Sequence, residues 1–359
     1  MSRMETTNDT KRNLPDGWRW VKLGEVIAEA QAGFACGLRD PQGIAQIRMN
    51  NVDTRGNFVW DDVLRVPHEA NDIEQFQIVP GDVLFNNTNS TELVGKSAVF
   101  EGYVEPIVYS NHFTRLRTVT KTLLPDFLAS WLNHQWQKGV FAAICNRWIG
   151  QSAVKADKLL NLDFPLPPLS EQRRIAEVLR EQMTAVEKAR AAAQARLEAV
   201  KTLPASLLRQ VFPQPGQSLP DGWRSVRLAE LATVISGQHI LESDYNQSGR
   251  GIGYLTGPAD FGATKPAITN RMFLFSFLIT RFNHFQKNAM GATVPGLSRE
   301  DLEMLEIPLP PLDEQQRIAA VLREQVAAVA KARASAEEEL QTISALPAAL
   351  LCRAFNGEL

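Results

Sequence analysis

A run of amide and hydroxyl side chains follows a short apolar segment in the stretch FNNTNSTELVGKS. Its members are Asn86, Asn87, Thr88, Asn89 and Ser90, with Lys96 a little further on. Amides can pair with adenine through two hydrogen bonds in the major groove of DNA, and lysine reaches phosphate oxygens. An Asx-rich turn without a ligand accounts for the same residues equally well. The composition is therefore suited to a DNA contact without requiring one.

A second polar segment, NRWIGQSAVKADK, lies further along the chain at 146–158. It combines Arg147, Gln151, Lys155 and Lys158 with the large aromatic residue Trp148. Basic side chains contact phosphates and glutamine contacts base edges, so this mixture also suits DNA. The alternative interpretation is a solvated loop in which Trp148 packs inward.

Motifs of catalysis are missing from the sequence. The segment LVGKSA is close to a phosphate-binding loop, but GxxxxGKS would require glycine at Ser90 and a helix where AVFEGYV indicates a strand. No dinucleotide fingerprint, amino-methyltransferase motif or nucleophile elbow occurs, and the five histidines lack metal-ligand spacing. We therefore expect a binding protein rather than an enzyme, with no cofactor and no metal.

Bulk composition limits the class of protein further. The chain has 359 residues, 44% hydrophobic and 22% charged, which is enough to bury the cores of two or three domains. A net charge of −2 counts against a nucleic-acid binder that acts alone. No apolar run approaches a membrane span and the polar start lacks a signal-peptide core, so we expect a cytoplasmic protein without membrane contact. Cys36, Cys145 and Cys352 are scattered and are expected to be buried thiols.

An internal duplication organises the chain. The segment PLPPLSEQRRIAEVLREQ at 165–182 recurs at 308–325 as PLPPLDEQQRIAAVLREQ, and more than half of the aligned positions of 165–212 and 308–355 are identical. The openings LPDGWRWVKLGEV at 14 and LPDGWRSVRLAEL at 219 also match, but they lie further apart along the chain than the two later segments do. The second globular segment is therefore much shorter than the first, and nothing in it matches the stretch from about 65 to 119.

Each copy predicts a long helix with an apolar seam. Ser170 and Asp313 are the expected N-caps, and Pro204 and Pro347 are expected to break the helices near their ends. The seam positions recur at alternating spacings of four and three, the 3.5-residue period of a coiled coil, so we expect the two helices to pair in antiparallel fashion. Two surface helices that each cover their own domain are the alternative. The predicted seams are Ile175, Leu179, Gln182, Val186, Ala189, Ala193, Arg196, Val200, Leu203, Leu207 and Ile318, Leu322, Gln325, Val329, Ala332, Ala336, Glu339, Ile343, Leu346, Leu350.

The predicted fold is α+β, with two mixed, strand-rich globular segments separated by two long helices in an antiparallel coiled coil with pseudo-two-fold symmetry. The first globular segment should consist mainly of strands and end in a helix that starts near Pro125. In the second, NRMFLFSFLITRF takes the place of this helix. The predicted boundaries are 14–164, 165–212, 213–307 and 308–359.

The paired PLPP-L-x-EQ-x-RIA-x-VL segments, the repeated GW-x-x-V-x-L openings and GDVLFNNTNSTELVGKSAVF together resemble the specificity subunits of type I restriction-modification systems. The resemblance covers nearly the whole chain from residue 14. It implies two target recognition domains, the second one shortened, that each read half of a bipartite double-stranded DNA target. The helices would act as a spacer and dock two methyltransferase subunits, and larger assemblies would add a restriction subunit. S-adenosylmethionine and catalysis would belong to the methyltransferase, which would also supply much of the phosphate neutralisation.

Two sets of site residues follow from these considerations. The predicted partner-binding residues are Pro168, Glu171 and Gln172 with their repeat equivalents Pro311, Glu314 and Gln315. The predicted DNA-binding residues are Arg48, Asn86, Asn87, Thr88, Asn89, Ser90, Lys96, Arg115, Arg147, Gln151, Lys155, Arg250, Lys265, Arg271, Ser298 and Arg299. A degenerate specificity-like scaffold that binds methyltransferases without full sequence recognition is the alternative function, and an enzyme with an unrecognised site is a second.

Overall fold

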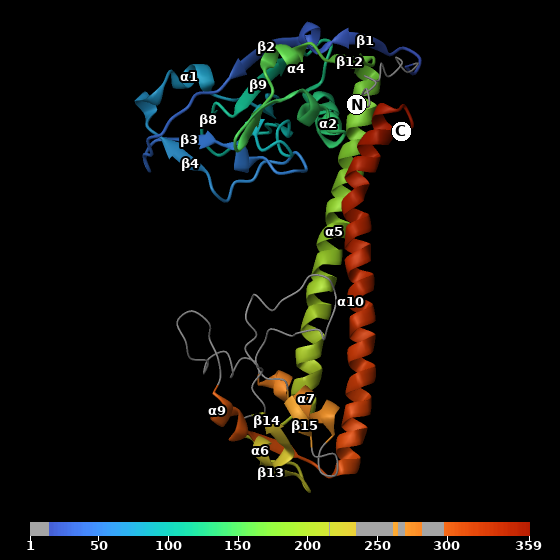
Figure 1. The fold of residues 1–359 in the computed structure, drawn as a ribbon. Coiled ribbons are helices and arrows are strands. Elements are labelled where there is room, and N and C mark those ends of the chain that lie inside the picture. Colours follow the sequence, from blue (N-terminus) through green and yellow to red (C-terminus); the bar gives the residue numbers. More distant parts are fainter. Residues whose placement is uncertain (1–13, 215, 235–260, 265–269, 282–297) are drawn as a thin grey trace, which may run out of the picture. The chain divides into compact units, whose positions relative to one another are not determined.

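The computed structural model describes residues 14–214, 216–234, 261–264, 270–281 and 298–359. The chain divides into two compact units, Met1–Arg190 with Thr342–Leu359, and Ala191–Gln341. Each unit combines one globular part with one end of each of the two long helices, α5 (Leu169–Val211) and α10 (Leu312–Phe355) (Figure 1).

Short strands form the globular part of the first unit. A four-stranded sheet has the order β2 (Ile27–Ala32), β9 (Phe113–Thr118), β5 (Val83–Asn86), β7 (Ser97–Val99). A three-stranded sheet has the order β4 (Leu64–Val66), β3 (Ile44–Ile47), β8 (Ile107–Tyr109), in which β3 and β8 run parallel. Short helical turns connect them: η1 (Leu23–Val26), η2 (Met49–Asn51), η3 (His68–Ala70) and α1 (Ile73–Phe76).

Strand β5 is buried on both faces because a core lies on each side of it. Val83 and Phe85 belong to the cluster that includes the helix α2 (Pro125–Gln137), whereas Leu84 belongs to the cluster around strand β3. This alternation is the two-residue period of a strand. Helix α2, which starts at the predicted proline, buries Trp131 against Phe164, with ring centroids 4.9 Å apart. The predicted helix is confirmed, but it does not end the globular segment as predicted, because α3 (Val140–Ile144), α4 (Ala156–Leu160) and three further strands follow it.

The duplication extends to the register of one strand pair in each unit, in which the first strand of the globular part pairs with its last. Strand β1 (Arg19–Lys22) pairs with β12 (Asp163–Leu166), so that Arg19 lies opposite Leu166. Strand β13 (Arg224–Arg227) pairs with β16 (Glu306–Leu309), so that Arg224 lies opposite Leu309. The partners occupy equivalent positions of the two copies, and in each case the second strand leads directly into the long helix.

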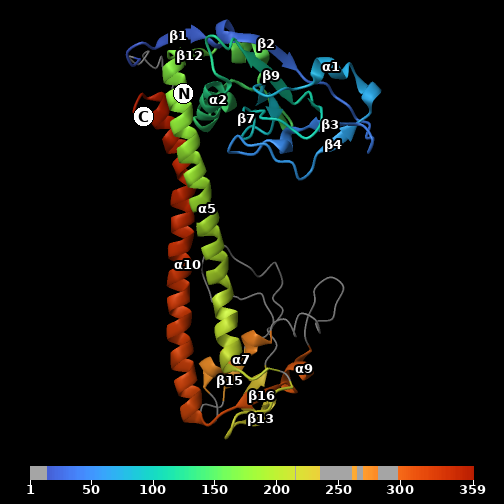
Figure 2. The same ribbon diagram turned by 180° about the vertical axis from the view of Figure 1, so that it is seen from behind.

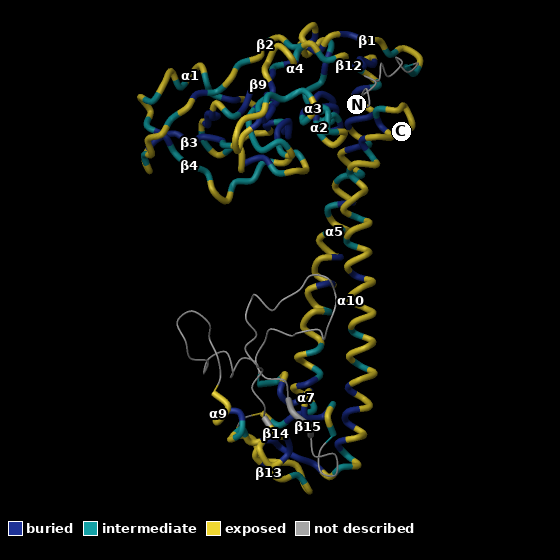
Figure 3. The backbone as a smooth tube through the Cα atoms, viewed as in Figure 1, coloured by how far each residue is buried: buried dark blue, intermediate teal, exposed yellow. Residues whose placement is uncertain are grey.

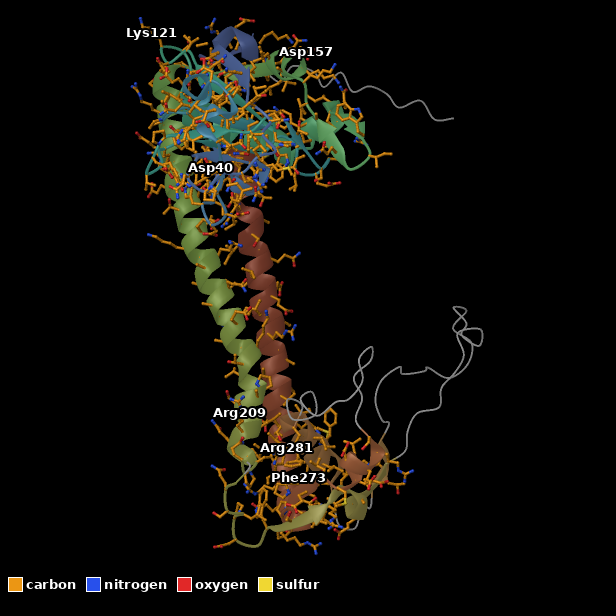
Figure 4. The ribbon with its side chains drawn as sticks, turned by 90° about the vertical axis from the view of Figure 1, so that its left-hand side faces the viewer. Asp40, Lys121, Asp157, Arg209, Phe273 and Arg281 are labelled. Atoms are coloured by element: carbon orange, nitrogen blue, oxygen red, sulfur yellow. The ribbon has the colours of Figure 1, made fainter. Side chains whose placement is uncertain are left out.

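The second unit keeps a reduced version of the first. It contains α6 (Leu228–Leu231), the antiparallel pair β14 (Ala232–Val234) and β15 (Phe261–Thr264), α7 (Arg271–Thr280) and α9 (Arg299–Glu303). Helix α7 is the expected counterpart of α2. Its Phe273 and Phe277 pack on Phe212 of the segment that ends α5, with ring centroids 5.2 and 5.5 Å apart, and Figure 4 places Phe273 beside this end of α5.

Within each unit the two long helices lie side by side and run antiparallel (Figures 1 and 2). In the first unit, Ile175 near the start of α5 shares a core with Leu351 near the end of α10. In the second unit, Leu208 near the end of α5 shares a core with Ile318 near the start of α10. The antiparallel pairing and the α+β fold class are confirmed. Arg196 and Glu339, which occupy the same position in the two copies, form an ion pair at 3.2 Å between the helices.

The seam keeps its predicted period only in part. Leu179, Val186 and Ala193 are buried at the predicted seven-residue spacing, but Arg196 and Leu203, which were also predicted on the seam, are exposed. In α10, Glu339 and Leu346 are likewise exposed. Over the whole of α5 the buried residues Ile175, Val186, Leu197 and Leu208 recur every 11 residues. Eleven residues make three turns of 3.67 residues, close to the 3.6 of an unstrained helix, so the seam stays in line without left-handed supercoiling. Figure 3 shows the resulting buried positions among exposed ones along both helices.

The helix ends also need correction. Helices α5 and α10 begin at Leu169 and Leu312, so Ser170 and Asp313 lie inside the first turn instead of capping it. Pro204 and Pro347 lie within continuous helices rather than breaking them. A proline removes one helical hydrogen bond, but buried residues beyond each proline, such as Phe212 and Ala354, keep the last turns packed.

Two smaller observations complete the fold. Cys36 and Cys145 are half-buried and Cys352 is exposed, so the prediction of buried thiols was wrong for Cys352. Among the described helices, none is long and apolar enough to cross a membrane.

Candidate functional site

The two polar segments noted in the sequence lie on one small sheet. Its order is β10 (Asn146–Trp148), β11 (Gln151–Ala153), β6 (Thr88–Asn89). Thr88 lies opposite Ala153 and Asn89 opposite Ser152. The Thr91 and Ser152 hydroxyls are 2.7 Å apart, and the Val154 N–H donates to the Asn87 carbonyl at 2.9 Å. We call this three-stranded sheet the polar sheet.

The hairpin of the polar sheet presents large side chains to solvent. Trp148 is 60% exposed and Ile149, at the tip, is fully exposed, so the interpretation in which Trp148 packs inward was wrong. Gly150 closes the turn with a φ of +81°, which favours glycine. Arg147, Gln151 and Lys155 are also exposed. These side chains are available to a partner without any rearrangement.

Hydrogen bonds hold the base of this hairpin to the preceding helix. The ammonium group of Lys158 donates to the Ile144 carbonyl at 2.7 Å and to Asn146 Oδ1 at 3.2 Å. The Arg147 guanidinium donates to the Ala142 carbonyl at 3.0 Å. The hairpin is therefore anchored at its base while its tip stays accessible.

Asn86 and Asn87 hold the loop before β6 together. Asn86 is fully buried, and its Nδ2 donates to the His112 carbonyl at 2.8 Å and to the Thr88 carbonyl at 3.1 Å, while its Oδ1 accepts from Asn89. Asn87 Nδ2 donates to Thr114 Oγ1 at 3.0 Å and to the Asn111 carbonyl at 3.2 Å. In this conformation both amides are used inside the protein. The accessible members of the run are the half-buried residues that follow them, Thr88, Asn89 and Ser90.

Lys96 points into the protein as well. It is 5% exposed, and its ammonium group donates to the Val52 carbonyl at 2.5 Å. Burial lowers its pKa, and Asp53 opposes this effect. The preceding Gly95 has a φ of +103°, and a Cβ there would lie 2.2 Å from the Phe141 ring. The glycine and lysine of LVGKSA are thus explained by packing, and the strand predicted after them is confirmed as β7.

Arg115 is another predicted DNA-binding residue whose side chain is buried inside the protein. It is 2% exposed, pairs with Glu29, and donates to the Gln77 carbonyl at 2.9 Å. Its guanidinium also lies 5.7 Å from the centre of the Tyr109 ring. Arg115 therefore joins strands β2 and β9 to the segment before β5.

A pocket of about 460 Å³ opens beside the loop that accepts the Asn86 and Asn87 amides. Arg48, a predicted site residue, lines it, and its guanidinium makes one long contact of 3.5 Å with Asn50 Oδ1. No sequence pattern indicates the other lining residues, because they come from three separate segments with no common spacing. They are Ala35, Cys36, Gly37, Arg39, Gln46, Met49, Asn50, Ser110, Asn111 and His112.

In the second unit, two of the predicted DNA-binding residues belong to a helix start. The Ser298 hydroxyl accepts from the Asp301 N–H at 3.0 Å and so caps α9, and Arg299 pairs with Glu303 at 2.6 Å. Arg271 is the exposed first residue of α7. Arg250 and Lys265 lie outside the described residues.

The duplicated glutamines bind inside the chain. Gln172 has no exposed surface; its Oε1 accepts from the Leu124 N–H at 2.9 Å, and its Nε2 donates to the Thr122 and Pro167 carbonyls at 2.8 and 2.9 Å. Gln315 repeats this arrangement with the Asn270 N–H at 2.7 Å and the Pro310 carbonyl at 2.8 Å. Each glutamine thus joins a long helix to the start of α2 or α7.

The remaining predicted partner-binding residues lie near the surface. Pro168 and Pro311 are exposed. Glu171 pairs with Arg174 at 2.7 Å, and this pairing lowers the pKa of the carboxyl group. Glu314 pairs with Arg317 at 3.4 Å in the equivalent position.

Comparisons with known proteins identify the family to which this chain is similar. A model of the type I restriction modification DNA specificity domain matches residues 15–193 and 260–334. A putative specificity subunit of the type I restriction enzyme MjaX from Methanocaldococcus jannaschii is 27% identical over 86% of this chain and 87% of its own length.

Two solved structures are similar over nearly the whole chain. One comes from a study of complex assembly and conformational transition of the type I R-M system; it is 26% identical, with a TM-score of 0.76 over 96% of this chain and 99% of the other. The HsdS subunit from Thermoanaerobacter tengcongensis is 26% identical, with a TM-score of 0.59 over 98% and 99% of the two chains. The family model covers well over half of the chain and the internal repeat matches at the level of strand register. This chain therefore belongs to the family of type I restriction-modification DNA specificity proteins, as a specificity subunit without a catalytic role of its own.

Proposed function

We propose that the first unit reads one half of a bipartite double-stranded DNA target through the polar sheet. The observation that carries this proposal is the convergence of two distant polar segments, 88–90 and 147–155, on one sheet with an exposed hairpin. A hairpin of two strands can enter the major groove of DNA. The anchored base and the accessible tip suit such an element.

The exposed side chains contact different parts of the DNA according to their chemistry. Arg147 and Lys155 contact phosphates, whereas Gln151 contacts base edges. Trp148 and Ile149 provide apolar surface for thymine methyl groups or for stacking on a base. The buried residues Asn86, Asn87, Lys96 and Arg115 hold the sheet and its surrounding loops in place.

Residues 213–307 read the second half of the target in this proposal. Arg271 and Arg299 are the described candidates for contacts there, with Arg250 and Lys265 as further ones from the sequence. Because this segment is shorter, it offers fewer side chains to bases. We expect it to read fewer base pairs than the first unit.

The partners follow from the same assignment. Two methyltransferase subunits dock at equivalent surfaces near Pro168 and Glu171 in one copy and Pro311 and Glu314 in the other. Each methyltransferase supplies S-adenosylmethionine and the adenine-methylating chemistry, and a restriction subunit joins the larger assembly. The net charge of −2 fits this division, since partner subunits then neutralise much of the phosphate charge.

The test is to reconstitute the chain with its methyltransferase and map the methylated sites. A split motif with an unread gap is the expected result, and specific binding should survive random-sequence competitor DNA. Binding to the methyltransferase without any sequence preference would show the degenerate scaffold instead. A motif confined to one side would show that the shortened segment does not read DNA.

A further inference from the structure

The polar wall of the pocket beside residues 110–112 is basic. Arg39 and Arg48 both line it, and no aspartate or glutamate is among the described residues that line it. His112 contributes no charge of its own, since burial and the nearby Arg48 lower the pKa of its imidazole and favour the neutral form, so the positive charge at the pocket comes from the two arginines. The pocket therefore favours an anionic ligand.

Two hydrogen-bond donors at this pocket lack partners among the described residues. They are Arg48 Nε and the hydroxyl of Ser110, a residue that is 5% exposed. A buried donor without a partner is costly, so an acceptor brought by a ligand would offset this cost. Arginine forks match the oxygen geometry of phosphate groups. A volume of about 460 Å³ has room for a phosphate together with the nucleoside to which it is attached.

The lining segment 110–112 is hydrogen-bonded to the polar sheet and to the two asparagines that precede it. The Asn111 and His112 carbonyls accept the Asn87 and Asn86 amides at 3.2 and 2.8 Å, and the His112 carbonyl also accepts from the Thr88 N–H at 3.4 Å. A ligand bound at Arg48 and Ser110 would thus contact a segment that is joined to β6 by the hydrogen bond between the Thr88 N–H and the His112 carbonyl. Contacts at the pocket would set the position of the sheet on its target.

We propose that this pocket binds a phosphate group, and that in the DNA complex it holds a backbone phosphate beside the half-site read by the polar sheet. The second part rests on the proposed function. The first part concerns the pocket alone and does not depend on sequence recognition.

The first experiment titrates inorganic phosphate and deoxyadenosine monophosphate into the full chain and follows the melting temperature and the NMR signal of the His112 ring. Wild-type protein should respond to both, and Arg48→Gln should weaken binding at least about tenfold. Ser110→Ala should weaken binding too, yet leave the melting temperature without ligand unchanged or higher, because its hydroxyl has no partner to lose. Arg209→Gln, which removes the same charge at an exposed position of α5 outside the pocket, is the matched control and should bind like wild type.

The second experiment measures specific DNA binding by the assembled complex at several salt concentrations. Loss of one phosphate contact in Arg48→Gln should make the negative slope of log K, the logarithm of the association constant, against log salt concentration shallower by about 0.9. The preferred sequence should not change.

The outcomes are distinguishable. Identical phosphate titrations for wild type and Arg48→Gln would overturn the pocket assignment. Phosphate binding that depends on Arg48, together with an unchanged salt slope, would support a phosphate site but overturn its use for DNA in favour of a free phosphate compound. A complex without sequence preference would refute the proposed function, while the phosphate titration would still decide the pocket.

Discussion

The side-chain amide of Gln172 caps the start of helix α2 by accepting the Leu124 N–H at 2.9 Å, although the two residues are 48 positions apart. The same amide donates to two carbonyls, and Gln315 repeats the arrangement in the second unit. The glutamine of the repeated PLPPLxEQ segment therefore sets the angle between a long helix and the globular part that it carries.

Replacing Gln172 with alanine should lower the free energy of unfolding by about 3 kcal/mol, because a buried N–H and two carbonyls lose their partner. Urea denaturation followed by tryptophan fluorescence would measure the loss. Gln194→Ala, at an exposed position of the same helix, is the matched control and should change stability by less than about 0.5 kcal/mol. Equal effects of the two substitutions would contradict the role of Gln172.

Trp148→Ala should weaken specific DNA binding by about tenfold or more, since stacking or groove contact by an aromatic ring contributes on the order of 1–3 kcal/mol per base. Stability should stay the same, because the ring is 60% exposed. Fluorescence anisotropy with the reconstituted complex would measure the affinity. Val104→Ser, at a site that is 91% exposed on another loop, is the control, and a comparable loss there would argue against a specific contact.

His134 should make the first unit sensitive to acid. Burial, with a smaller effect of Lys138, lowers the pKa of His134 from 6.5 to about 4. Between pH 6.5 and pH 4, His134 is therefore protonated in the unfolded chain and neutral in the folded chain. The free energy of unfolding should fall as the pH drops from 6.5 towards 4. His134→Phe, which keeps a ring against Phe355, should reduce the loss between pH 7 and pH 5 by about 2 kcal/mol.

Urea denaturation at the two pH values would check this acid dependence. His68→Phe, at an exposed site, controls for the substitution itself. If His134→Phe lost as much stability on acidification as wild type, the acid sensitivity would have to be assigned to other groups.

The 11-residue period predicts which helix deletions are tolerated. Removing 187–197 from α5 together with 330–340 from α10 keeps the buried positions in line, so the protein should fold and melt cooperatively. Removing 187–195 and 330–338 instead turns the seams by about half a turn and should abolish cooperative melting.

The same deletion tests the spacer role. Removing 11 residues shortens each helix by about 16 Å, which corresponds to roughly five base-pair steps of DNA. Methylation mapping should show a target with a different gap, or no methylation. An unchanged gap would rule out a spacer role for helix length.

The sequence predicted the elements that depend on local pattern and on repetition. The matching seams of the two copies predicted the antiparallel pairing, and Pro125 marked the start of α2. The seam departs from its predicted period at Arg196 and Glu339 because the neighbouring residues, Leu197 and Leu340, are apolar. An unstrained helix could therefore bury Leu197 and half-bury Leu340 instead of the charged side chains.

The direction of individual side chains could not be predicted in the same way. Asn86 is buried because its amide meets the His112 carbonyl, which is distant in sequence, and no local rule indicates that contact. The pairing of β6 with β11, which unites the two polar segments, likewise depends on tertiary structure. The pocket at Arg48 assembles from three segments, and its unpartnered donors are visible only in the folded chain.

The ion pair between Arg196 and Glu339 joins equivalent positions of the two copies. In a pair of identical half-length chains, this position would face its own copy across the symmetry axis, so that arginine would meet arginine or glutamate would meet glutamate. The opposite charges on the two copies in this chain therefore disfavour self-association of either half. They favour the pairing of one copy with the other.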